Sequence, residues 1–72
     1  MTPALLARAG EAAFGPRWQS ELGRALGVTD RTVRNWSTGT TALPEGLGAR
    51  LRAVLGDRAE LIAAVRRELP RR

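Results

Sequence analysis

Apolar residues recur along the chain with helical spacing, and short glycine, proline and threonine signals divide them into segments. Thr2 and Pro3 suit the N-cap and first position of a helix that ends at Gly15. Pro16 opens a second helix, and Gly27 ends it in a left-handed conformation. The residues of these helices expected to face a core are Leu5, Leu6, Ala9, Ala13, Phe14, Trp18, Leu22 and Leu26.

A third helix is predicted to begin after Thr29, a suitable N-cap, and to run to about Thr38, where Gly39 stops it. Val33 and Trp36 lie three residues apart and form its buried side. Residues 40–43 form a linker.

Two more helices are predicted in the remaining segment. One spans residues 44–55 and is ended by Gly56; the other spans residues 57–69, where Asp57 followed by Glu60 resembles a capping box. Their apolar faces consist of Leu47, Leu51, Val54, Leu55, Leu61, Ile62, Val65 and Leu69. With no strand signal, the predicted fold is all-α: a compact bundle of five short helices.

Size and composition limit the classes of protein. Seventy-two residues allow one domain, 1–72, and a hydrophobic content of 43% suits a globular chain. The absence of cysteine and histidine excludes disulfides and the usual zinc sites, and no cofactor is predicted. With scattered carboxylates and no glycine-rich loop after a strand, we expect no enzyme and no small-molecule ligand.

The charge balance points to a polyanionic partner. The formal net charge is +5, which favours nucleic acid. All twelve basic residues are arginine, a residue suited to phosphate and guanine contacts, although a GC-rich genome produces the same bias. No apolar run approaches the roughly 20 residues that span a bilayer, and the N-terminus lacks the pattern of a secretory signal. We therefore expect a cytoplasmic, nucleoid-associated protein.

The outward side of the third helix carries the chemistry typical of DNA recognition. At about 100° per residue, the side opposite Val33 and Trp36 consists of Arg31, Arg34, Asn35 and Thr38. Arginine forks onto guanine, and asparagine bonds adenine in two places. An exposed basic face is often only a solvated surface, but these four residues together favour contacts to bases in the major groove. Trp18 and Trp36 lie on apolar stripes, which favours core packing over base stacking.

Two neighbours of this face have alternative roles. Asp30 could hold the guanidinium of Arg34 four residues later, accept from a cytosine amino group, or favour the positive helix N-terminus, and the last is preferred. Thr32 points partly toward the core and is a marginal candidate for a DNA contact.

The segment from Gln19 to Gly39 resembles the Cro/C1-type (lambda-repressor-like) helix-turn-helix family. The resemblance rests on Gln19, on L-G-V-T at 26–29, on T-V at 32–33 and on W-x-x-G at 36–39, followed by Pro44. It implies that the second and third helices form a helix-turn-helix. It also implies a phosphate contact from Gln19 and base contacts from Arg31, Thr32 and Asn35. Gly23 departs from the alanine usual in that family.

Other polar groups are candidates for contacts to the DNA backbone. Arg17 and Thr29 join Gln19 as possible phosphate contacts, because helix N-termini attract phosphate oxygens. The basic C-terminal residues Arg66, Arg67, Arg71 and Arg72 are better explained by favourable charge at a helix C-terminus and a solvated end.

The sequence predicts a DNA-binding transcriptional regulator, most simply a small repressor of phage, plasmid or mobile-element type. It would bind a near-palindromic operator as a homodimer, with the last helix as the candidate dimer interface. Two alternatives remain: an architectural or recombination accessory protein that binds phosphates, and a helical protein-interaction module that binds no DNA.

Overall fold

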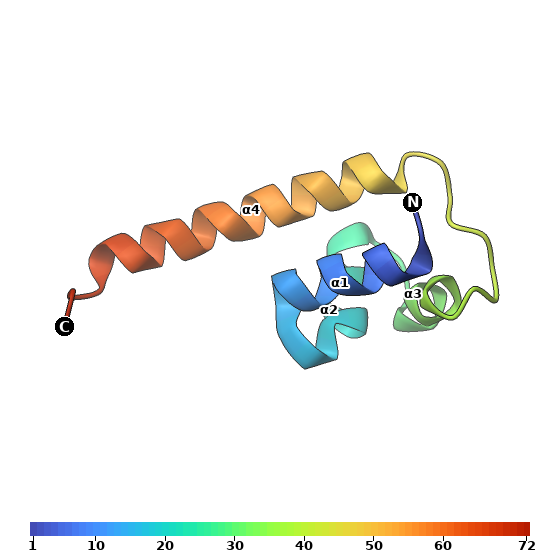
Figure 1. The fold of residues 1–72 in the computed structure, drawn as a ribbon, viewed down its shortest axis with the longest axis horizontal. Helices are drawn as coiled ribbons and strands as arrows, with labels where there is room; N and C mark the ends of the chain where they lie inside the picture. The colour runs from blue at the N-terminus through green and yellow to red at the C-terminus, as the bar shows by residue number, and fades with distance from the viewer.

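The computed structural model describes all 72 residues as an all-helical chain without strands. Its α-helices are α1 (Pro3–Phe14), α2 (Trp18–Leu26), α3 (Asp30–Ser37) and α4 (Leu47–Glu68). A 3₁₀ turn, η1 (Gly15–Arg17), joins α1 to α2. α1 packs against each of the other three helices, and α2 and α3 pack closely against each other (Figure 1).

The signals at the ends of the first three helices act as predicted. The hydroxyl of Thr2 accepts from the backbone N–H of Leu5, and that of Thr29 accepts from the N–H of Thr32, both at 3.1 Å. Gly27 ends α2 with a φ of 76°, a left-handed conformation that β-carbons disfavour. One boundary differs: Pro16 lies in the 3₁₀ turn, so α2 begins at Trp18.

A single apolar cluster holds the four helices together. It consists of Leu6, Trp18, Leu22, Leu26, Val33, Trp36, Leu47 and Leu51. Both tryptophans are buried as predicted. Leu5 was expected in this core but is 47% exposed, because α1 turns that side away from its three neighbours.

Gly10 sets the distance between α1 and α2. A β-carbon built on Gly10 would lie 2.1 Å from Cε3 of Trp18, much closer than real β-carbons approach other atoms. The indole ring therefore occupies the space that any other residue at this position would need. This contact brings α1 against the start of α2.

The prediction of two helices in the last third of the chain is wrong. α4 is one continuous helix of 22 residues, and Gly56 lies inside it. It begins at Leu47 rather than Pro44, because Gly46 adopts a left-handed φ of 79° immediately before it. A glycine inside a helix costs only about 1 kcal/mol, which contacts on both sides of it can offset.

Two arginines make these contacts on either side of Gly56. Arg50 donates to the backbone carbonyl of Leu26, at the C-terminus of α2. Arg58 donates from Nε to the carbonyl of Ala13 at 3.1 Å and lies 4.8 Å from the ring centroid of Phe14. Because these arginines bind the free C-terminal carbonyls of α2 and α1, both halves of α4 are held to the bundle in one line.

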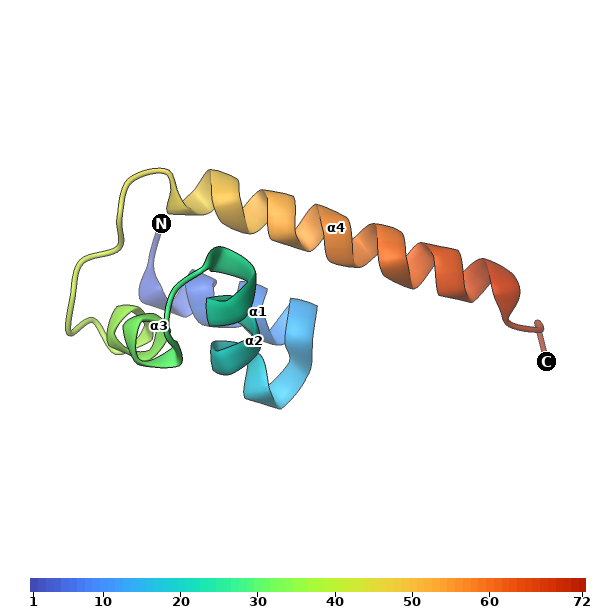
Figure 2. The ribbon, with the colours of Figure 1, turned by 180° about the vertical axis from the view of Figure 1, so that it is seen from behind.

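The predicted compact shape applies only to part of the molecule. The chain measures 46 × 22 × 20 Å, and α4 continues well beyond the other helices (Figures 1 and 2). Its last turns carry Leu61, Ile62 and Val65, which together with Leu69 immediately after the helix are 51–60% exposed. These residues were expected to pack in the bundle but instead remain uncovered. No helix is both long and apolar enough to cross a membrane.

Replacing Gly56 by alanine is expected to raise the free energy of unfolding by about 1 kcal/mol, because Gly56 is helical and a β-carbon there meets nothing within 4 Å. Urea denaturation followed by circular dichroism measures the change. If Gly56 instead ended a helix with a positive φ, the alanine variant would be less stable than the parent.

Candidate nucleic-acid interface

α3 is fixed to the bundle by one side and exposes the other. Val33 is fully buried and Trp36 is 7% exposed, so packing against the bundle holds α3 in one rotation and tilt. Arg31, Arg34 and Thr38 lie on the exposed side, and Asn35 beside them is half-buried. The orientation predicted from helical periodicity is therefore the one observed.

The turn before α3 is tight because of Gly23. The backbone N–H of Val28 donates to the carbonyl of Gly23 at 2.8 Å. A β-carbon on Gly23 would lie 2.9 Å from the carbonyl oxygen of Val28. The glycine that departs from the family pattern thus allows an especially close approach between α2 and the turn that starts α3.

Arg31 and Asn35 have the side chains of α3 that are most available to a ligand. Neither the guanidinium of Arg31 nor the side-chain amide of Asn35 makes an ion pair or hydrogen bond within the chain. The two residues are four positions apart, so they lie one turn apart on the same side of the helix. Together they present guanidinium and amide groups with free hydrogen-bonding capacity.

Arg34 is partly restrained by Asp30. Nη2 of Arg34 lies 3.8 Å from Oδ2 of Asp30, and both side chains are about half exposed. Such an exposed pair contributes little to stability, so a phosphate or base could compete for the guanidinium. Of the three roles considered for Asp30, its geometry matches the first, holding Arg34, while its place in the first turn also suits the helix dipole.

The threonines of α3 are engaged inside the protein. The hydroxyls of Thr29 and Thr32 are 3.0 Å apart, and that of Thr29 also caps the helix. Thr38 donates its hydroxyl to the carbonyl of Arg34 at 3.1 Å and lies 2.8 Å from the hydroxyl of Thr40. A DNA contact from any of these threonines would have to share or replace an internal hydrogen bond.

The candidate phosphate contacts lie at the starts of two helices. Arg17 is exposed in the 3₁₀ turn, and Gln19 is half-buried in the first turn of α2. Neither side chain has a hydrogen-bond partner within the chain. Thr29, as the cap of α3, stands at a second helix N-terminus, where the free N–H groups create positive potential.

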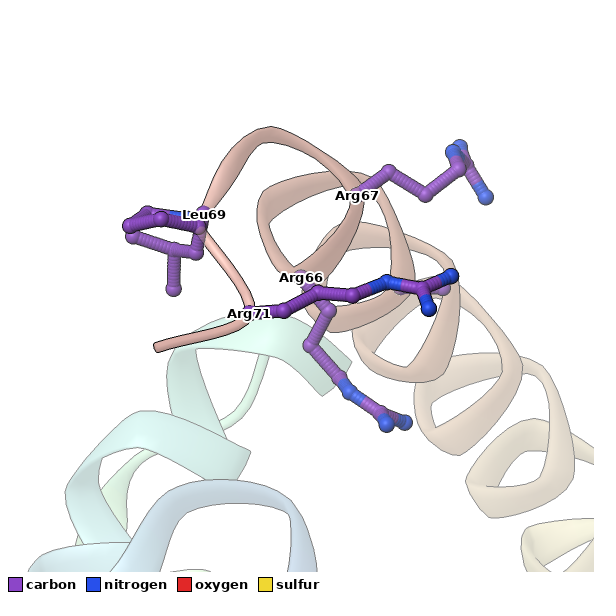
Figure 3. Close-up of a pocket in the computed structure, with 6 residues that line it drawn as sticks. Arg66, Arg67, Leu69 and Arg71 are labelled. Carbon is purple, nitrogen blue, oxygen red and sulfur yellow. The ribbon is translucent and has the colours of Figure 1, made fainter.

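The basic C-terminal end is far from this surface. Arg66, Arg67 and Arg71 line an open hollow of about 700 Å³, together with Ala63, Leu69 and Pro70. Figure 3 shows that the three guanidinium groups spread in different directions rather than converge on one point. The C-terminus and α3 lie at opposite ends of the molecule in both ribbon views. These arginines therefore form no continuous surface with α3.

Two arginines of α4, Arg50 and Arg58, were not singled out from the sequence. They support the helices against which α3 packs but do not lie on the exposed side of α3. By binding carbonyls of Leu26 and Ala13, they hold the ends of α2 and α1. No local pattern identifies such residues, because their acceptors lie 24 and 45 positions away along the chain.

Comparisons with known proteins found no matching family model, no similar curated protein and no similar solved structure.

Proposed function

We propose that the chain is a sequence-specific double-stranded DNA-binding protein in which α2 and α3 form a helix-turn-helix resembling the Cro/C1 type. The observation that carries this proposal is the pair Arg31 and Asn35, whose unpaired side chains project from a helix anchored by Val33 and Trp36. The groups are those that recognise guanine and adenine in the major groove.

In the proposed complex, α3 enters the major groove along its exposed side. Arg31 forks onto O6 and N7 of a guanine. Asn35, about 6 Å farther along α3, bonds N6 and N7 of an adenine about two base pairs away in the same half-site. Arg34 exchanges its ion pair with Asp30 for a base or a phosphate. Thr32 and Thr38 are second-rank candidates for base contacts, because their hydroxyls are already engaged.

Backbone contacts would set the position of α3 in the groove. Arg17, Gln19 and Thr29 stand at helix starts, where N–H groups and side chains meet phosphate oxygens. The net charge of +5 adds a sequence-independent attraction that weakens with salt.

The biological role that fits this mechanism is a small transcriptional repressor. A helix-turn-helix domain regulates most simply by occupying an operator and excluding polymerase. Acting as a homodimer, it would place two copies of α3 in major grooves on one side of a near-palindromic site, about 34 Å or a multiple of that distance apart.

Selection of bound sites from random duplexes tests this function. We expect enrichment of an inverted repeat whose half-sites each contain a guanine and an adenine, with centres about 10 base pairs or a multiple of that spacing apart. Recovery of duplexes with no shared sequence would favour phosphate-based architectural binding. Absence of any binding at about 50 mM salt, where phosphate contacts are strong, would leave only a protein-interaction role.

A further inference from the structure

The apolar side of α4 extends past the helices that it packs against. Placing Leu61 at 0° and advancing 100° per residue puts Val65 at about 40° and Ile62 at about 100°. The buried Leu47 and Leu51 fall at about 40° and 80° in the same frame. One stripe therefore runs the length of α4, covered by the bundle in its first half and uncovered in its second.

The length of α1 explains why the stripe is left uncovered. α1 has 12 residues and α4 has 22, so α4 extends beyond α1 by several turns. Arg58, which binds the last turn of α1, marks the end of the covered part. Beyond it lie the four exposed residues that we call the overhang: Leu61, Ile62, Val65 and Leu69.

We propose that the overhang is an interface with a second copy of this chain, whose own overhang packs against it in antiparallel orientation. Sterics select the direction. A parallel partner helix lying along the stripe would meet α1, which already covers the first half of α4. In antiparallel orientation the partner's bundle lies beyond the C-terminus of the first α4, where no other helix stands (Figures 1 and 2).

The charges of this segment are compatible with self-association. Residues 57–69 carry three acidic and three basic side chains, although the whole chain has a net charge of +5. Asp57 and Glu60 lie near the start of the segment, and Arg66 and Arg67 lie near its end. Antiparallel pairing brings the acidic end of one copy to the basic end of the other and also opposes the two helix dipoles.

The size of the overhang predicts the strength of the pairing. Residues 57–68 of α4 span about 18 Å, and one side of a helix is about 10 Å wide. Such a contact is smaller than a standard stable interface, so the dimer should be a weak one with a dissociation constant in the micromolar range or above. A near-palindromic duplex would strengthen it by holding two copies close together.

This interface would supply a homodimer for the proposed function. Because α3 and the overhang lie at opposite ends of a molecule 46 Å long, the two copies of α3 would stand more than one turn of DNA apart and would fit half-sites about two turns apart. The interface itself is tested without DNA. Sedimentation equilibrium of the full chain up to about 500 µM should show a monomer–dimer equilibrium. Val65→Glu should weaken dimerisation at least tenfold, since it places two charges in the interface. The matched control is Leu5→Glu, which puts the same charge on an exposed leucine of α1 and should leave dimerisation unchanged.

Orientation is measured with single cysteines, because the chain contains none. In the antiparallel dimer, Val65→Cys lies near the twofold axis and should be joined to its counterpart by a short bis-maleimide. Leu69→Cys residues, four positions farther along, would be separated by about 12 Å along the helix axis and should not be joined. If circular dichroism shows that Val65→Glu does not fold, these two milder cysteine variants still test the interface.

Three results would overturn the inference. One is a chain that stays monomeric at about 500 µM. Another is dimerisation that survives Val65→Glu but is lost in Leu5→Glu. A third is equal cross-linking of both cysteine variants. Because no DNA is present, failure here leaves the DNA-binding proposal standing, and failure of site selection leaves this one standing.

Discussion

Replacing Gly10 by alanine is expected to lower the free energy of unfolding by about 3 kcal/mol and the Tm by roughly 10–20 °C. The added β-carbon would overlap three atoms of the Trp18 ring, the nearest at 2.1 Å. Trp18 is only 6% exposed, and the atoms that would have to shift belong to its rigid ring rather than to the end of a flexible side chain. A protein of this length has a stability of only roughly 4–11 kcal/mol, so a large part of it would be lost.

The direction of the stability change in Gly10→Ala shows whether packing against Trp18 or helix propensity dominates at this position. Propensity alone predicts that alanine in a helix stabilises by about 1 kcal/mol, as expected for Gly56→Ala. Urea and thermal denaturation, followed by circular dichroism and tryptophan fluorescence, compare the two variants. Equal stabilisation of both would show that α1 and Trp18 do not pack as described.

Replacing Arg31 and Asn35 together by alanine is expected to reduce affinity for the selected duplex by about 100-fold or more, while binding to a scrambled duplex falls only slightly. Each bidentate base contact contributes on the order of 1–3 kcal/mol of discrimination. Arg31 is exposed and Asn35 is half-buried, and neither side chain has a partner within the chain, so the fold should be unaffected. Fluorescence anisotropy at two salt concentrations measures specific and non-specific binding separately.

Arg71→Ala is the matched control for this pair. It removes the same single positive charge but lies just after α4, at the opposite end of the molecule from α3 (Figure 1). We expect it to preserve the preference for the selected duplex. If the α3 variant lost affinity equally for both duplexes, base recognition by Arg31 and Asn35 would be wrong, and binding through phosphates would explain the data better.

Helix ends were the features most accessible from the sequence. Thr2 and Thr29 cap helices by bonding N–H groups three residues away, and Gly27 supplies a left-handed conformation. These interactions depend on neighbours in the chain, so local patterns identify them. The buried side of α3 was equally accessible, because Val33 and Trp36 are its only large apolar residues.

Gly56 shows why the same approach failed in α4. A glycine followed by Asp57 is a typical helix boundary, but the local preference amounts to only about 1 kcal/mol. Contacts with distant carbonyls, made by Arg50 and Arg58, act on both sides of it. Asp57 caps nothing, because a capping side chain acts only where N–H groups are free.

The sequence by itself determined the all-helical class, most helix ends and the outward residues of α3, because hydrogen bonds and periodicity within a few residues decide them. Only the tertiary structure decided that the side chains of Arg31 and Asn35 find no partner elsewhere in the chain. It also decided that α4 is continuous and that its last apolar residues have no cover. Those properties depend on atoms far apart in the chain and on the relative lengths of α1 and α4, which no local pattern encodes.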